Sequence, residues 1–227
     1  MFRALILVVG LVALIARAGF PDDSDVAKAT VPLDLPAPGR GAEELDEDAP
    51  ESITFYGSEY EGDAFFWCLD KSCSMGWDGE IETLKQETTD AILQLSSRAE
   101  FGINAFSSNT VVWASGPRRA STANKQSAVG WVQQLQPDGW TCLGPAAVQI
   151  LAIARESGAR RSSVLILGDG QPWCDGVDTG PAVLADVASA NYSSIPVHTL
   201  YISSSSDGVA FFQQLAQQNG GTFTLVP

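Results

Sequence analysis

Apolar stretches of strand length alternate with segments of helical periodicity from residue 53 to the end of the chain. The runs Ala64–Leu69 and Val164–Leu167 contain no polar break, which is typical of strands covered by helices on both sides. The alternation predicts an α/β domain with a doubly wound, mostly parallel central sheet and helices on both faces in three layers. Strands are expected at 53–56, 64–69, 101–106, 111–113, 163–167, 196–202 and 222–226, and the short run at 111–113 is expected to be one antiparallel edge strand. Helices are expected at 80–98, 144–155, 181–190 and 209–218.

Polar side chains with oxygen atoms follow the two apolar strands. Asp70, Ser72 and Ser74 come directly after the first strand, and Asp169 follows the second. Thr141 precedes the expected helix at 144–155. Because ligands of doubly wound sheets bind beyond the carboxyl ends of the strands, these side chains are expected to meet at one edge. Carboxylate and hydroxyl oxygens suit hard cations, Mg²⁺ above all and also Mn²⁺ or Ca²⁺.

The order Asp70-x-Ser72-x-Ser74, then Thr141, then Asp169 resembles the von Willebrand factor type A domain with its metal-ion-dependent adhesion site. The resemblance extends over residues 53–226 and implies the Rossmann-like fold of that family. It implies that the two serines ligate the cation directly, that the threonine does so directly or through water, and that the two aspartates act mostly through water and hydrogen bonds. It also implies that a carboxylate of a protein partner completes the coordination. Cys73 departs from the family, which most often has glycine there.

The sequence is compatible with three functions. The first is an exported binding module that uses its cation to bind an acidic group of a partner. The second is a metal-independent structural or envelope scaffold with the same fold. The third is a metallohydrolase, which the sequence supports least. His198 is the only histidine and lies in an expected strand, and no glycine-rich phosphate loop is present. We therefore expect no enzyme and name no catalytic residue.

Three of the six tryptophans flank the expected site loops. They are Trp77, Trp140 and Trp173. Tryptophan is enriched at binding hot spots and provides a flat face for sugars or side chains, so we consider an aromatic rim around the cation. The alternative is that each indole covers its own loop against the core. The rim hypothesis predicts that at least two of the three indoles are exposed on one face.

Four cysteines in an exported chain suggest disulfide bonds, and four cysteines allow three complete pairings. Cys73, Cys142 and Cys174 fall in the three loops assigned to the site, whereas Cys68 lies on the strand. Cys142 with Cys174 is the leading candidate, since this pair would connect the second and third site loops. Cys68 is the residue that fits best as a small buried hydrophobe.

The N-terminal segment predicts export. Thirteen residues from Ala4 to Ala16 are apolar apart from Gly10, which is shorter than the ~20 that a membrane span needs. With Arg3 before them and a small-x-small pattern ending at Ala18, residues 1–18 are expected to be a signal peptide. The mature chain would be periplasmic, at the cell surface or secreted, without a transmembrane span. An uncleaved signal would instead act as an N-terminal anchor.

The distribution of charge predicts a linker before the domain and bears on the class of partner. Residues 19–51 contain ten acidic residues, two basic residues and five prolines, which predicts a disordered acidic linker before a domain at 52–227. The whole chain has a net charge of −14. Nucleic-acid binding through a general electrostatic footprint needs a basic surface, so no nucleic-acid partner is expected. We expect a monomer.

Overall fold

The computed structural model describes residues 49–202, 206 and 208–226. Every described residue belongs to one compact unit. The expected signal peptide and nearly all of the expected linker lie outside the described residues. Within the described part, no helix has the length and apolar character that crossing a membrane requires.

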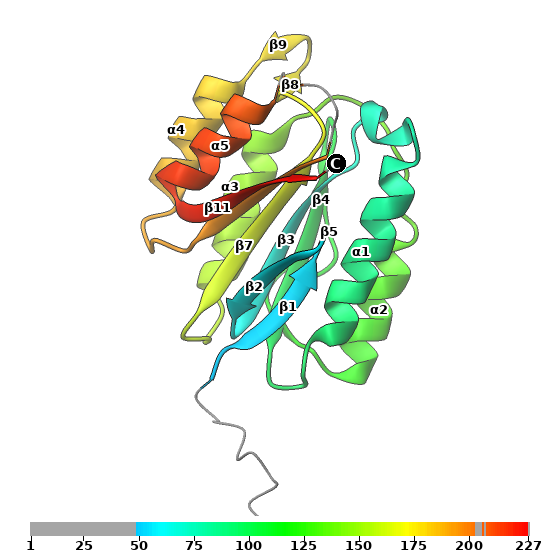
Figure 1. Cartoon of the computed structure of the whole chain (residues 1–227), viewed down its shortest axis with the longest axis vertical. Coiled ribbons are helices and arrows are strands. Elements are labelled where there is room, and N and C mark those ends of the chain that lie inside the picture. Colours follow the sequence, from blue (N-terminus) through cyan, green and yellow to red (C-terminus); the bar gives the residue numbers. More distant parts are fainter. Residues whose placement is uncertain (1–48, 203–205, 207, 227) are drawn as a thin grey trace, which may run out of the picture. The chain divides into compact units, whose positions relative to one another are not determined.

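A seven-stranded sheet forms the centre of the domain (Figure 1). Its order is β11-β10-β7-β3-β4-β5, and β6 also pairs with β4. The pairs among β11, β10, β7, β3 and β4 are parallel, whereas β5 and β6 run antiparallel to β4. The bounds are β3 Ala64–Asp70, β4 Glu100–Phe106, β5 Thr110–Val112, β6 Arg118–Arg119, β7 Ser162–Gly168, β10 Val197–Ile202 and β11 Gly220–Val226.

The predicted fold class is confirmed. All seven residues of β3 are buried, because helices cover both faces of the sheet. The antiparallel edge strand is β5, as predicted, and β6 adds a second short antiparallel pairing. The chain places β4 on one side of β3 and then returns to place β7 on the other side. Strand order therefore reverses between β3 and β7, and this is where a doubly wound sheet opens a binding crevice.

Two helical layers pack on opposite faces of this sheet (Figure 1). Alternate side chains of β3 divide between them: Trp67 joins the core under α1 and α2, and Phe66 joins the core under the other three helices. The helices are α1 Glu80–Gln94, α2 Thr122–Val132, α3 Leu143–Arg155, α4 Gly180–Ala190 and α5 Val209–Gln218.

Helix α1 ends four residues before the predicted boundary at Arg98. The backbone of Leu95 leaves the helical region, with φ −58° and ψ 135°. The backbone N–H of Ser96 then donates to Glu51 Oε2 at 2.9 Å, and the Ser96 hydroxyl also donates to that carboxylate. A tertiary contact to the first strand of the domain thus ends the helix.

A hairpin of β1 (Glu51–Phe55) and β2 (Ser58–Gly62) packs in the same core as α1 and α2. Tyr60 of the hairpin lies edge-on to His198 with ring centroids 5.0 Å apart, and its hydroxyl is 3.2 Å from Thr224 Oγ1. His198 Nδ1 accepts a hydrogen bond from the Thr222 backbone N–H at 3.1 Å. The only histidine of the chain therefore contributes to packing, and burial lowers its pKa.

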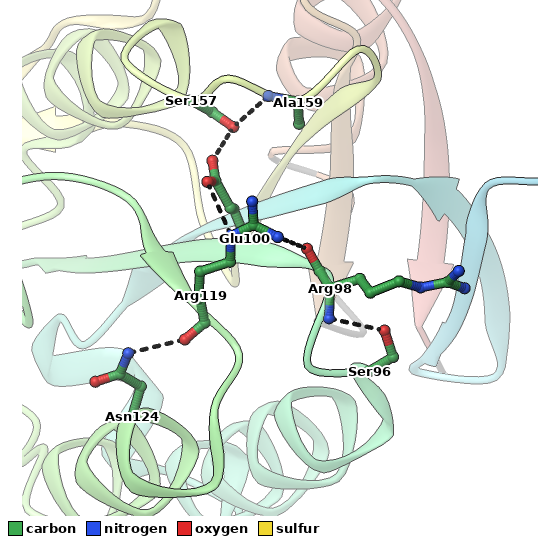
Figure 2. A network of polar contacts seen from close by, with 7 residues as sticks. All are labelled: Ser96, Arg98, Glu100, Arg119, Asn124, Ser157 and Ala159. Atoms are coloured by element: carbon green, nitrogen blue, oxygen red, sulfur yellow. Dashed lines mark hydrogen bonds and ion pairs between the residues drawn. The ribbon is translucent and has the colours of Figure 1, made fainter. Parts of the chain in front are cut away.

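Charges at the amino ends of the strands are paired. Figure 2 shows Glu100, at the start of β4, between Ser157 and Arg119. The Ser157 hydroxyl donates to Glu100 at 2.6 Å, and Arg119 Nε lies 3.6 Å from the same carboxylate. Arg161 meets Asp63 through Nε and Nη2, each at 3.0 Å. Both carboxylates are thus paired within the protein.

Candidate cation site

The candidate site lies at the carboxyl ends of β3 and β7, where the strand order reverses. Asp70 is the last residue of β3, and Asp169 directly follows β7. Thr141 lies just before α3, the helix that packs against β3. The topology thus brings together three segments that are far apart in the sequence, as the prediction required.

The loop after β3 turns sharply and presents its serines on one side. Asp70 is fully buried, and its Oδ1 accepts the backbone N–H of Ser72 at 2.7 Å. A short 3-10 helix, η1 (Cys73–Gly76), follows and is anchored by the buried side chain of Met75. The hydroxyls of Ser72 and Ser74 lie 3.2 Å apart. The two serines therefore form a pair of adjacent oxygen donors above a buried carboxylate.

Cys73 takes the place of the glycine that is common in the family without distorting this loop. It is not among the residues with positive φ, so its backbone conformation does not require glycine. Its N–H donates to the Gly139 carbonyl at 3.2 Å, and its side chain is exposed. The serines on both sides keep their places.

The β7 loop closes the cluster from the other side. Asp169 is 8% exposed, and its Oδ1 accepts a hydrogen bond from the Ser74 hydroxyl at 3.0 Å. Thr141 lines one pocket together with Ser72 and Ser74, with a volume of about 450 Å³. Hydrogen bonds thus connect four of the five predicted residues, and the fifth shares a pocket with the two serines.

Glu80 is a member of this cluster that the sequence analysis misses. It is the first residue of α1, and its carboxyl group is in hydrogen-bonding contact with that of Asp169. An acidic residue in the first turn of a helix is ordinarily explained by the helix dipole. Only its position shortly after the Ser74 loop could have drawn attention to it.

Burial and neighbouring acidic groups raise the pKa values of the carboxyl groups in this cluster. Burial, and then the charge of Asp169, raise the pKa of Asp70 to about 8. Burial and the same neighbour raise the pKa of Glu80 to about 7, and burial raises that of Asp169. Lys71, next in sequence, is directed elsewhere: its Nζ lies 2.5 Å from Asp138 Oδ1 and 3.1 Å from the Ser107 hydroxyl.

The donor set is compatible with a hard divalent cation. The buried Oδ2 of Asp70 has no hydrogen-bond partner among the described residues. The donors are all oxygen atoms, as Mg²⁺ prefers. In the described part of the chain, no three His, Cys, Asp or Glu side chains are grouped as metal ligands. A cation here would therefore depend on the hydroxyls of Ser72, Ser74 and Thr141.

A disulfide bond joins two of the site loops. Cys142, directly after Thr141, is bonded to Cys174, as the sequence analysis suggested. Cys174 lies on β8 (Trp173–Cys174), which forms a small hairpin with β9 (Val177–Asp178). The Thr141 N–H also donates to the Trp173 carbonyl at 2.8 Å. Cys68 is free and buried, as expected.

All three tryptophans of the predicted rim are exposed. The exposed fractions are 69% for Trp77, 48% for Trp140 and 46% for Trp173. Trp77 and Trp140 line the pocket that contains the hydroxyls, whereas Trp173 is not among its lining residues. None of the three indoles is buried, and an aromatic rim around a cation stays a prediction.

Comparison with known proteins identifies the family. Residues 69–225 match the family model described as von Willebrand factor type A domain. The chain belongs to this family. Over 163 residues it is also 27% identical to human inter-alpha-trypsin inhibitor heavy chain H6, an alignment that covers 67% of this chain and 12% of that relative. The chain thus corresponds to a small part of this relative's length.

Solved structures with the same fold include bacterial pilus proteins. A von Willebrand factor type A protein from Catenulispora acidiphila superposes with a TM-score of 0.62 at 21% identity, covering 72% of this chain and 38% of that chain. The von Willebrand factor domain of the type V pili tip protein Mfa5 from Porphyromonas gingivalis gives 0.58 at 10% identity, covering 77% and 90%. The pilus adhesin SpaC from Lactobacillus rhamnosus GG gives 0.59 at 16% identity, covering 71% and 28%. At these identities the likeness concerns the fold alone.

Proposed function

We propose that this von Willebrand factor type A domain binds a divalent cation, Mg²⁺ above all, and uses it to bind a carboxylate of a protein partner. Ser72, Ser74 and Thr141 would hold the cation. Asp70 and Asp169 would act mainly through water and hydrogen bonds. The observation that carries the proposal is the convergence of these hydroxyls with buried carboxylates that have no basic partner among the described residues.

The chemistry of the ligands explains why a partner's acid would be attracted. When bound, the cation supplies a Lewis-acidic position that a carboxylate oxygen can occupy. The neutral hydroxyls of Ser72 and Ser74 donate less negative charge than carboxylates would. The Asp169 carboxylate accepts from Ser74 at 3.0 Å and thereby fixes the direction of that hydroxyl. The disulfide of Cys142 keeps Thr141 beside them.

We propose a binding role without catalysis. The only histidine, His198 in β10, accepts a hydrogen bond from the Thr222 backbone N–H and packs against Tyr60 of β2. It therefore has a structural role. The neighbours that are themselves a pili tip protein and a pilus adhesin support an exported, adhesion-type setting for this chain. We extend the same proposal to a monomeric chain without a nucleic-acid partner, in agreement with the net charge of −14.

Calorimetric titration of the intact chain with MgCl₂ and MnCl₂ tests this function. A Ser72→Ala, Ser74→Ala double variant removes two hydroxyls and leaves every carboxylate in place. The matched control is Ser189→Ala, Ser193→Ala, which removes two exposed hydroxyls far from the site in sequence. We expect one cation per chain for the parent and the control, and none for the site variant. A parent that binds neither metal would contradict the proposal and favour the metal-independent scaffold.

A further inference from the structure

The pocket beside the candidate cation ligands is lined by two chemically different kinds of side chain. They are the hydroxyls of Ser72, Ser74 and Thr141 and the indoles of Trp77 and Trp140. Its volume of about 450 Å³ can receive a large side chain. The two indoles expose 69% and 48% of their surface, although exposed tryptophan is unfavourable in water. A ligand that reaches the hydroxyls would therefore have apolar surface next to it.

The lining distinguishes between two classes of ligand. Besides the hydroxyls and the indoles, the pocket is lined by Cys73 and Gly139. Among the described residues that line it, none carries a side-chain amide, carboxylate or guanidinium group. Sugar rings present several hydroxyls that are costly to leave unpaired, and the three hydroxyls that line the pocket would be engaged by the cation. An apolar side chain needs only contact with the two indoles.

We infer that the partner is a protein segment in which a carboxylate side chain and a large apolar side chain lie on the same face. In an extended segment, residues two positions apart share a face, with about 7 Å between their Cα atoms. The acid would reach the cation, and the apolar side chain would pack between Trp77 and Trp140. This inference rests on the proposed cation-dependent binding and specifies the partner of that same site.

Two short peptides and one sugar acid test the inference on the intact chain in MgCl₂. The first peptide contains Asp-Ala-Phe, the second contains Asp-Ala-Ser, and the sugar acid is glucuronate. Binding is followed through the indole N–H signals of the six tryptophans in two-dimensional NMR spectra. We expect the phenylalanine peptide to bind about tenfold more tightly than the serine peptide, since a buried aromatic side chain dominates such contacts. The signals of Trp77 and Trp140 should shift most.

Substitutions separate contact from stability. Trp77→Ala with Trp140→Ala should reduce the affinity for the phenylalanine peptide to that for the serine peptide, without changing Mg²⁺ binding. Tyr192→Ala is the matched control, because this aromatic residue is 75% exposed and stacks under Arg155 outside the pocket. Its affinities should equal those of the parent.

Several outcomes would overturn the inference. Equal affinity for the two peptides would show that the indoles do not recognise an apolar side chain. Glucuronate binding as tightly as the phenylalanine peptide would assign the pocket to acidic saccharides. Peptide binding that persists in EDTA would separate the pocket from the cation. In all three cases Mg²⁺ binding by the parent would remain intact, whereas a parent that binds no Mg²⁺ would contradict the proposed function itself.

Discussion

The two edges of the central sheet treat charge in opposite ways. At the amino edge, Asp63 is held by two nitrogens of Arg161, and Glu100 is shared between Ser157 and Arg119 (Figure 2). At the carboxyl edge, the charge of Asp169 raises the pKa values of Asp70 and Glu80, and no cationic side chain in the described part of the chain pairs with these carboxylates. Charges paired within the protein serve the fold, whereas charges left unpaired and buried indicate a site whose neutralising charge comes from outside.

The edges also differ in how their loops are held. The amino edge relies on hydrogen bonds and ion pairs, and the carboxyl edge has the disulfide between Cys142 and Cys174. The double variant Cys142→Ser, Cys174→Ser should lower the free energy of unfolding by about 3–4 kcal/mol, as expected for opening a loop of this length. Urea unfolding of the intact chain measures it. A loss below about 1 kcal/mol would mean that the loops are held mainly by their other contacts.

Removing one carboxylate charge at each edge should have effects of opposite sign. In EDTA at pH 8, Asp70→Asn should raise the free energy of unfolding by about 2 kcal/mol, because it removes a buried and uncompensated charge. Asp63→Asn should lower it by about 1 kcal/mol, because it breaks a partly exposed ion pair with Arg161. Denaturant titration of both variants beside the parent decides this. Destabilisation of similar size at both edges would remove the contrast.

The contrast also predicts how stability depends on pH. The pKa of Asp70 is raised to about 8 and that of Glu80 to about 7, above the values of the unfolded chain. The folded state therefore binds more protons, and in EDTA the free energy of unfolding should fall as pH rises from about 5 to about 8 and level off above that. Asp70→Asn should flatten this dependence, and Asp63→Asn should leave it unchanged. A flat profile for the parent would contradict the unpaired character of the carboxyl edge.

The smallest expected effect is that of Glu80 on cation affinity, and it can be compared with that of a second glutamate in the same helix. Glu80→Gln should weaken Mn²⁺ binding about tenfold, because it removes one negative charge beside Asp169. Glu82→Gln is the matched control. It removes the same charge two residues later in the helix, where the carboxylate is paired with Lys85 at 3.0 Å. Calorimetric titration should find parental affinity for this control. Equal affinities for the two variants would exclude Glu80 from the site.

The elements with strong hydrophobic patterns were predictable from the sequence. The apolar runs of β3 and β7 and the amphipathic α3 are where periodicity placed them, to within one residue at each end. Helix α2 was missed, because Thr122–Val132 has only two buried positions and hence no clear apolar face. Strand β2 was missed because its sequence, Ser-Glu-Tyr-Glu-Gly, contains one buried aromatic residue among charged neighbours.

The candidate site divides in the same way. Its five predicted residues follow one another along the chain in the order of a known motif. Their convergence could therefore be expected from the sequence, because ligands bind beyond the carboxyl ends of the strands. The role of Glu80 could not, because its contact with Asp169 joins the start of α1 to the end of β7, two segments that only the folded chain brings together. The ion pair between Lys71 and Asp138 is likewise a tertiary contact that the local sequence does not predict.

Crystals of the intact chain soaked in MnCl₂ provide the most direct test, through anomalous scattering from manganese. The account predicts one strong anomalous peak at the carboxyl edge, about 2.0–2.3 Å from the hydroxyl oxygens of Ser72 and Ser74. Crystals of the Ser72→Ala, Ser74→Ala variant should lack it. A parent without a peak there, or a peak only at other surface carboxylates, would contradict the claim that this edge is a cation site.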